Sequence, residues 1–268
     1  MLFIISRRYD VVKNAFILLS GGPSIYDPKD PDRHDQSWDN FVTPPLLRAN
    51  KGALHDPKTE DVHWLVYEDA YRERWSSDVA SQKSAPTQYQ HTVDIKIRHN
   101  RLNYLDLLKA RAKDRGWKYE GISPAQGFWD YINKLKGTKV SRVWFYGHAR
   151  DDLWLSLNHR ASDHVAISPD SDAILTCTDI KKIAAFSFVP QKAATHPHKF
   201  FGCNTKAFAE TWATTLTVFA EGSSGKVGFE KIHERGGKVR LSAGAQWYQY
   251  SKTSAPRLLH SKAGEEVD

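Results

Sequence analysis

The chain has 268 residues and a mass of 30.5 kDa, long enough to bury an apolar core without disulfide or metal staples. Hydrophobic residues make up 40% and charged residues 26% of the sequence, so an intrinsically disordered chain is excluded. The formal net charge of +7 favours solubility and weak attraction to anionic surfaces, but it indicates no particular function.

The chain contains two cysteines, Cys177 and Cys203, too few for a disulfide framework or a four-cysteine zinc site.

The apolar run at residues 2–5 is shorter than the core of a signal peptide, and no long apolar span follows it. We therefore expect no membrane insertion. The expected location is the cytoplasm, or outside the cell after export by a secretion system that needs no signal peptide.

Short apolar runs rich in β-branched and aromatic residues predict buried strands, and apolar residues at helical spacing predict helices between them. In chain order we expect strands at 14–19 and 62–67, helices at 102–112 and 128–135, strands at 140–146 and 199–202, a helix at 208–216 and a strand at 216–220. Strands that alternate with helices indicate an α/β fold with a central, mostly parallel sheet flanked by helices.

We expect a single domain over residues 1–268, with its core at about 14–229. Polar stretches with turn-forming residues predict long loops at about 23–52 and 76–90. From about residue 236 to 268 we expect C-terminal edge strands, at 238–242 and 246–250, followed by a polar tail that frays.

Two motifs place a reactive side chain just past the end of a predicted strand. Residues 143–149 read Val-Trp-Phe-Tyr-Gly-His-Ala, and residues 198–205 read His-Lys-Phe-Phe-Gly-Cys-Asn-Thr. The carboxyl ends of neighbouring parallel strands form one rim where ligands bind, so His148 and Cys203 are expected to meet there. A histidine and the start of the following helix both favour the reactive thiolate. The turn at residues 18–24 is expected to line the same rim.

Each of these residues also has a structural interpretation. A histidine at a sheet rim can be satisfied by a backbone carbonyl, and a free cysteine is frequently a small buried hydrophobe. The two matching contexts together favour a catalytic His148 and Cys203. Cys177 precedes no glycine, and we expect it to pack in the core.

The two motifs together resemble those of the caspase-like cysteine peptidases of clan CD, which include caspases, metacaspases, separase, gingipains and bacterial CHAT-type proteases. The likeness is greatest to bacterial caspase-like and CHAT-type domains, which carry a Gly-Cys-Asn step followed by a helix and a strand of small residues, as at Gly202-Cys203-Asn204, 208–216 and 218–225 here. It covers roughly residues 14–229. The resemblance implies a three-layer α/β sandwich and a thiol protease with a His148/Cys203 catalytic dyad, without cofactor or metal.

The resemblance also implies roles for the backbone at this site. Cys203 would attack the scissile carbonyl, His148 would transfer the proton, and the N–H groups of Ala149 and Cys203 would face the oxyanion. Most of the clan has glycine where this chain has Ala149. Many metacaspases carry an acidic residue where this chain has Phe201, so their preference for basic substrates does not carry over.

A substrate pocket is expected at the same rim. Glu221 is the only acidic side chain in residues 218–225 and would select Lys or Arg if it faced the pocket, and the alternative is a carboxylate that points to solvent. The further candidates for this pocket are Ser223, Ser20, Gly21 and Asp151.

Other interpretations remain open. The chain can be a caspase-like binding module without peptidase activity, or a metal-dependent hydrolase that uses His148, His196 and His198. Basic residues at 97–101 and 109–118 could contact a nucleic-acid backbone, but a solvated helix face is favoured, and no nucleic-acid partner is expected.

Analogy with bacterial caspase-like enzymes suggests a defence protease, or an effector or toxin delivered by contact-dependent secretion. The expected partner is a protein or peptide substrate, and an inhibitor or immunity protein is a further candidate.

Overall fold

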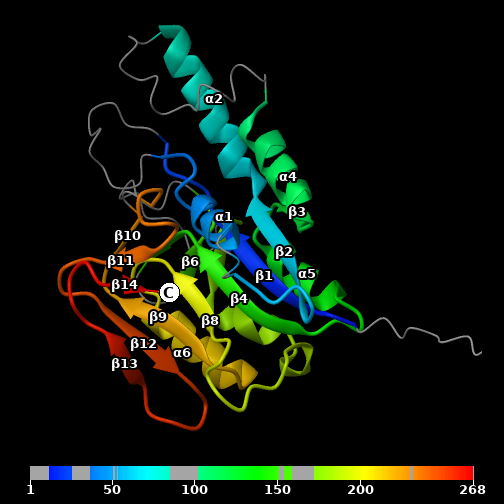
Figure 1. The fold of residues 1–268 in the computed structure, drawn as a ribbon, viewed down its shortest axis with the longest axis vertical. Coiled ribbons are helices and arrows are strands. Elements are labelled where there is room, and N and C mark those ends of the chain that lie inside the picture. Colours follow the sequence, from blue (N-terminus) through cyan, green and yellow to red (C-terminus); the bar gives the residue numbers. More distant parts are fainter. Residues whose placement is uncertain are drawn as a thin grey trace, which may run out of the picture.

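The computed structural model describes residues 12–25, 37–50, 52, 54–84, 102–150, 154–158, 172–229 and 232–267. At its centre lies an eight-stranded sheet with the strand order β13-β12-β9-β8-β4-β1-β2-β3 (Figure 1). The strands are β1 (Asn14–Ser20), β2 (Glu60–Tyr67), β3 (Lys118–Ile122), β4 (Val140–Tyr146), β8 (His198–Phe201), β9 (Ala220–Ser224), β12 (Gln246–Tyr250) and β13 (Arg257–His260).

The strands from β3 to β9 run parallel, and β12 and β13 extend the sheet by antiparallel pairing. The predicted α/β fold with a mostly parallel central sheet is therefore confirmed. The chain moves outward from β1 through β2 to β3, and from β4 through β8 to β9 in the other direction. The strand order thus reverses between β1 and β4, and ligands of open α/β sheets bind at the carboxyl ends beside such a point.

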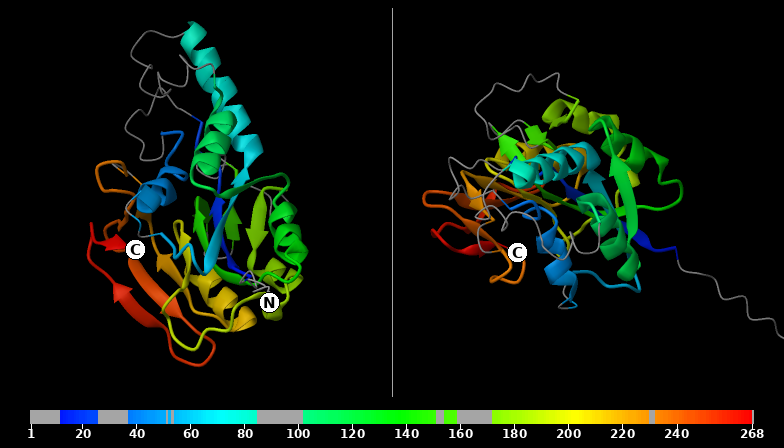
Figure 2. Two further views of the ribbon diagram at one scale, coloured as in Figure 1. Left: turned by 45° about the vertical axis from the view of Figure 1, so that its right-hand side comes forward. Right: turned by 90° about the horizontal axis from the view of Figure 1, so that it is seen from above.

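Helices cover both faces of the sheet (Figures 1 and 2). On one face α1 (Thr43–Asn50) and α4 (Tyr104–Asp114), with the first turns of α2 (Glu68–Ser84), pack against Phe16, Trp64 and Trp144 of the sheet. We call this the α1/α4 core. On the other face α5 (Gln126–Lys134), α6 (Lys206–Leu216) and the 3-10 helix η3 (Cys177–Lys182) form the α5/α6 core.

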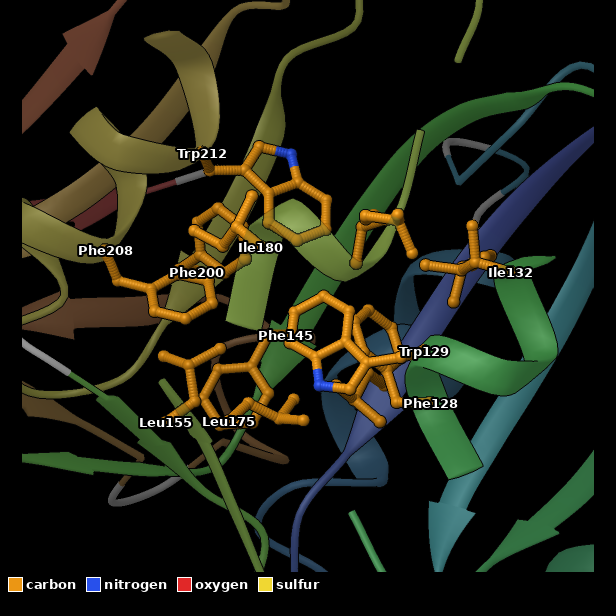
Figure 3. Close-up of a cluster of buried hydrophobic side chains, with 14 of the residues drawn as sticks. Phe128, Trp129, Ile132, Phe145, Leu155, Leu175, Ile180, Phe200, Phe208 and Trp212 are labelled. Carbon is orange, nitrogen blue, oxygen red and sulfur yellow. The ribbon is translucent and has the colours of Figure 1, made fainter. Parts of the chain in front are cut away.

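Aromatic side chains fill the α5/α6 core (Figure 3). The ring of Trp212 on α6 stacks on Trp129 of α5 with centroids 6.3 Å apart and on Phe208 at 6.0 Å. Phe200 of β8 meets Trp212 edge-on at 5.4 Å. Trp212 is therefore the residue through which two helices and the sheet contact one another.

Two small sheets stand beside the central one. Strands β10 (Val227–Gly228), β11 (Val239–Leu241) and β14 (Glu266–Val267) form one of them, and their side chains close the α1/α4 core. Strands β5 (His148–Arg150), β6 (Trp154–Ser156) and β7 (Ile174–Thr176) form the other, which continues from the carboxyl end of β4.

The structure differs from the sequence-based prediction between α6 and β9. Leu216 ends α6, because it continues the helical spacing of Phe208 and Trp212, and Thr217 then takes a left-handed φ of 59°. The strand begins at Ala220 and not at Leu216, so the strand predicted at 216–220 is wrong except for its last residue. A continuous apolar run does not distinguish a buried helix end from a strand.

Four further stretches predicted as loop or tail, or not assigned, are regular elements. The loop predicted at 76–90 is helical as far as Ser84 in α2, and α1 occupies 43–50 within the other predicted loop. The predicted fraying tail forms β13 and β14. The edge strand β3 has the polar sequence Lys-Tyr-Glu-Gly-Ile, which carries too little hydrophobic alternation to be recognised.

None of the helices in the described part of the chain is both long and apolar enough to cross a bilayer.

We expect Trp212→Ala to lower the free energy of unfolding by about 3–5 kcal/mol, because the truncation leaves a cavity where α5, α6 and the sheet meet. Urea unfolding followed by circular dichroism measures this. Phe186→Ala is the matched control, since Phe186 is 81% exposed and its loss should change stability by less than about 0.5 kcal/mol. Equal effects of the two variants would contradict the assignment of Trp212 to the core.

Candidate active site

His148 and Cys203 follow neighbouring strands at the same level. Tyr146 of β4 pairs with Phe201 of β8, and His148 and Cys203 stand two residues further along their strands. The Gly147 N–H donates to the Phe201 carbonyl at 3.3 Å, so the two chains stay together one step beyond the sheet. The structure therefore brings these two predicted residues to one rim.

Both side chains contact residues of the α1/α4 core. The His148 ring meets Phe41 edge-on with centroids 4.8 Å apart. The Cys203 Sγ lies 3.8 Å from the Val227 carbonyl oxygen, and Cys203 packs against the same core. Both residues are half-buried. The imidazole and the thiol thus share one side of the sheet and one apolar neighbourhood.

Gly202 allows the two turns to approach each other. A Cβ at this position would lie 3.0 Å from the Gly147 carbonyl oxygen and 3.1 Å from the Ala149 Cβ. These separations are shorter than ordinary van der Waals contacts, so any side chain at 202 would push the histidine and cysteine turns apart.

The turn that carries Cys203 is tight and doubly anchored. Asn204 has a left-handed φ of 55°, which asparagine tolerates better than most residues. Its N–H donates to the Gly225 carbonyl, and its Oδ1 accepts from the Gly225 N–H, both at 2.8 Å. Helix α6 begins at Lys206, so the cysteine lies just before a helix amino end, where the helix dipole favours negative charge.

Ser223 holds the turn that carries Cys203 through hydrogen bonds. Its hydroxyl donates to the carbonyls of Gly202 at 2.8 Å and Gly225 at 3.1 Å, and its N–H donates to the Thr205 hydroxyl at 3.0 Å. Ser223 is fully buried. The sequence places Ser223 in the substrate pocket, but in the structure its hydroxyl holds the cysteine turn and is not offered to a ligand.

The loop after β1, residues 21–25, also lies at the rim, next to His148. The Ser24 hydroxyl lies 3.3 Å from Nε2 of His148, and Ser24 is buried. Ser20 donates to the Phe41 carbonyl at 2.9 Å and accepts from Nε1 of Trp64 at 3.0 Å. The Gly21 N–H donates to the Tyr146 carbonyl at 2.8 Å. Ser20 and Gly21, predicted as pocket residues, are thus part of the framework of the rim.

Ser24 is not among the predicted pocket residues, although the turn at 18–24 is predicted to line this rim. The sequence signal for it is its position four residues after β1, beside the point where the strand order reverses.

Glu221 lies within β9, opposite Lys199 of β8. Its carboxylate lies 3.2 Å from the Lys199 Nζ and accepts hydrogen bonds from Nε1 of Trp247 at 3.1 Å and Nε2 of Gln249 at 2.8 Å. Glu221 is 4% exposed. Its negative charge is already matched by Lys199, so the geometry does not support the expected role in selecting basic substrates, nor the alternative of a solvent-facing carboxylate.

Two of the three histidines of the metal-dependent alternative, His196 and His198, lie at the other end of β8. His198 is fully buried, and its Nδ1 accepts the Val143 N–H at 3.0 Å. His196 is exposed and precedes the strand, whereas His148 and Cys203 follow the carboxyl ends. Among the residues that the structure describes, no three His, Cys, Asp or Glu side chains are grouped as metal ligands.

The remaining predicted residues are placed as follows. Cys177 is the first residue of η3 and packs against the α5/α6 core. Ala149 is half-buried in β5, where it pairs with Leu155 of β6. Asp151 and the basic stretch 97–101 lie outside the described residues.

No protein-family model, curated protein or solved structure matches this chain.

Burial and the charge of Arg142 lower the pKa of His198 from 6.5 to about 3. Between these values the unfolded chain binds a proton that the folded chain does not, so stability falls as the pH falls from 6.5 toward 3. This histidine alone should contribute about 1.4 kcal/mol per pH unit. His198→Asn keeps an acceptor for the Val143 N–H without titrating, and urea unfolding at several pH values should show a slope smaller by about one proton. Equal slopes would contradict a neutral, buried His198.

We expect Glu221→Gln to lower the free energy of unfolding by about 3 kcal/mol, because it leaves the Lys199 ammonium in the sheet without its counterion. The double variant Lys199→Met with Glu221→Gln should recover most of this loss in urea unfolding. An unchanged free energy of unfolding in Glu221→Gln would contradict the assignment of Glu221 as the buried counterion of Lys199.

Proposed function

We propose that this chain is a cysteine endopeptidase with a caspase-like fold, in which Cys203 is the nucleophile and His148 transfers the proton. The observation that carries the proposal is the register of β4 and β8, which puts His148 and Cys203 two residues beyond the Tyr146–Phe201 pair. The strand–turn–helix setting of Cys203 and the layered sheet with helices on both faces support it.

In the proposed reaction His148 takes the proton of the Cys203 thiol. Because Nε2 of His148 lies against Ser24, Nδ1 is the nitrogen assigned to this transfer. The thiolate sulfur bonds to the scissile carbonyl carbon, and the carbonyl electron pair moves to oxygen, where the N–H groups of Cys203 and Ala149 would stabilise it. His148 then protonates the leaving amine as the C–N bond breaks. Water hydrolyses the resulting thioester with His148 as the base.

The wider role that we propose rests on the family resemblance alone. The substrate would be a protein or peptide, and the chain would act as a bacterial effector, toxin or defence protease, with an inhibitor or immunity protein as a second partner.

Cys203→Ala and His148→Ala should each reduce cleavage of a denatured protein or peptide library by at least about 1,000-fold, because a dyad loses its chemistry with either member. Cys177→Ala should keep full activity, since Cys177 packs against the α5/α6 core. Mass spectrometry of the peptide products measures cleavage, and circular dichroism confirms the fold of each variant. Full activity in Cys203→Ala would overturn the proposal.

Two further measurements separate the alternatives. A thiol-directed peptide electrophile should label Cys203 in the parent protein and lose its target in Cys203→Ala, whereas a binding module without peptidase activity would stay unlabelled. Activity should survive strong chelators, because a Cys/His dyad needs no metal. Loss of activity with chelator and recovery with added zinc would favour a metal-dependent hydrolase.

A further inference from the structure

Helix α2 buries an ion pair beside the rim. Arg74 and Asp78 stand four residues apart on this helix, with side chains 0% and 1% exposed. The Arg74 Nε donates to both carboxylate oxygens of Asp78, at 3.0 and 2.9 Å. Burial raises the pKa of Asp78, which reflects the cost of removing a carboxylate from water.

Stability does not explain this pair. A buried ion pair gives little or no advantage over apolar residues of the same volume, because the two charges lose their hydration. Other polar residues of α2, such as Arg72, Glu73 and Ser76, are exposed to solvent. Arg74 lies on the same helix but is fully buried. A charged pair kept in such a place therefore suggests a task that apolar side chains could not perform.

The guanidinium reaches the histidine in two steps. Nη1 of Arg74 donates to the Ser24 carbonyl in a short hydrogen bond. The hydroxyl of the same serine lies 3.3 Å from Nε2 of His148. The loop after β1 is thus held from one side by α2 and contacts the histidine on the other.

A second route leads from the ion pair back to the same imidazole. The Tyr104 hydroxyl donates to Asp78 at 2.6 Å. The Tyr104 ring stacks on Trp38 with centroids 4.1 Å apart and an interplanar angle of 4°. Trp38 stands three residues before Phe41, whose ring meets His148 edge-on. The ion pair is therefore linked, through the Ser24 carbonyl and through Tyr104 and Trp38, to two segments that touch the imidazole.

We propose that Arg74 and Asp78 are positioning residues for His148. Arg74 fixes the Ser24 carbonyl and thereby holds the Ser24 hydroxyl 3.3 Å from Nε2 of His148, and we assign this hydroxyl as the acceptor of Nε2–H of the neutral imidazole. This selects one tautomer and leaves the Nδ1 lone pair for the Cys203 proton, as an oriented base requires. The proposal deepens the proposed peptidase function and rests on it.

The test removes both charges together. Arg74→Met with Asp78→Leu leaves no unpaired buried charge, but it removes the partners of the Ser24 carbonyl and the Tyr104 hydroxyl, so we expect a modest fall in the free energy of unfolding. The kcat for peptide cleavage should fall by about 10- to 100-fold with little change in KM, because a small displacement of the base costs rate and not binding. The matched control is Arg142→Met with Glu60→Leu. That pair is another buried arginine and carboxylate, 2.7 Å apart, at the opposite end of the sheet, and its loss should leave kcat unchanged.

A spectroscopic signature separates positioning from a merely structural role. In Cys203→Ala protein, the ring nitrogen NMR shifts of His148 should report one tautomer with the proton on Nε2. The same protein with the double replacement at 74 and 78 should show a mixture of tautomers. Ser24→Ala removes the hydroxyl through which the ion pair would act, and it should give the same mixture and the same loss of kcat. An unchanged tautomer and an unchanged kcat in this variant therefore overturn the proposal even where the double variant does not fold.

An unchanged tautomer together with an unchanged kcat in Ser24→Ala and in the double variant overturns the proposal. A fall in kcat that the Arg142 and Glu60 control reproduces also overturns it, because the effect would then follow from general destabilisation. The NMR measurement needs no peptidase activity. If the peptidase function itself fails, a shifted tautomer still shows that the ion pair positions His148, and an unshifted one shows that it does not.

Discussion

The parallel pairing of β1, β4 and β8 is the constraint on which the site depends. Ser20 pairs with Tyr146 and Tyr146 with Phe201, so three strands end in one row. Each is followed directly by a glycine, at 21, 147 and 202. A Cβ on Gly147 would lie 2.5 Å from the Phe145 ring, and one on Gly202 would crowd the Gly147 carbonyl. Because the turns pack backbone against backbone, Ser24, His148 and Cys203 emerge on neighbouring turns of the same rim.

Buried hydroxyls donate to backbone carbonyls at and around the rim, so these carbonyls keep a partner away from water. Ser20 donates to the Phe41 carbonyl, Thr205 to the Phe200 carbonyl, and Ser223 to the Gly202 carbonyl. These short side chains are buried, and their hydrogen bonds hold the turns of the rim in place. The supporting residues Ser20, Thr205 and Ser223 are therefore buried, whereas His148 and Cys203 themselves are half-buried.

The sequence predicts the residues whose context is local. The apolar runs of β4 and β8, each ending in glycine and a reactive side chain, are visible without a structure, and so is the helix after Cys203. Glu221 and the Arg74–Asp78 pair could not be assigned in this way. The partner of Glu221 is Lys199, and only the β8/β9 register places them together. Arg74 and Asp78 have the spacing of an ordinary solvent-exposed helix pair, and only the packing of α2 and α4 shows that they are buried.

Two potentially reactive residues, His198 at the start of β8 and Cys203 just past its end, differ in their burial. At its start, His198 is sealed among aromatic rings and serves as a neutral acceptor for the Val143 N–H, so its chemistry is suppressed by burial. At its end, Cys203 is half-buried in a turn held by Asn204 and Ser223. Burial keeps His198 away from solvent and from any ligand, whereas Cys203 stays partly exposed in its anchored turn. Burial therefore separates His198, which stabilises the fold, from the half-buried Cys203, which we propose as the nucleophile.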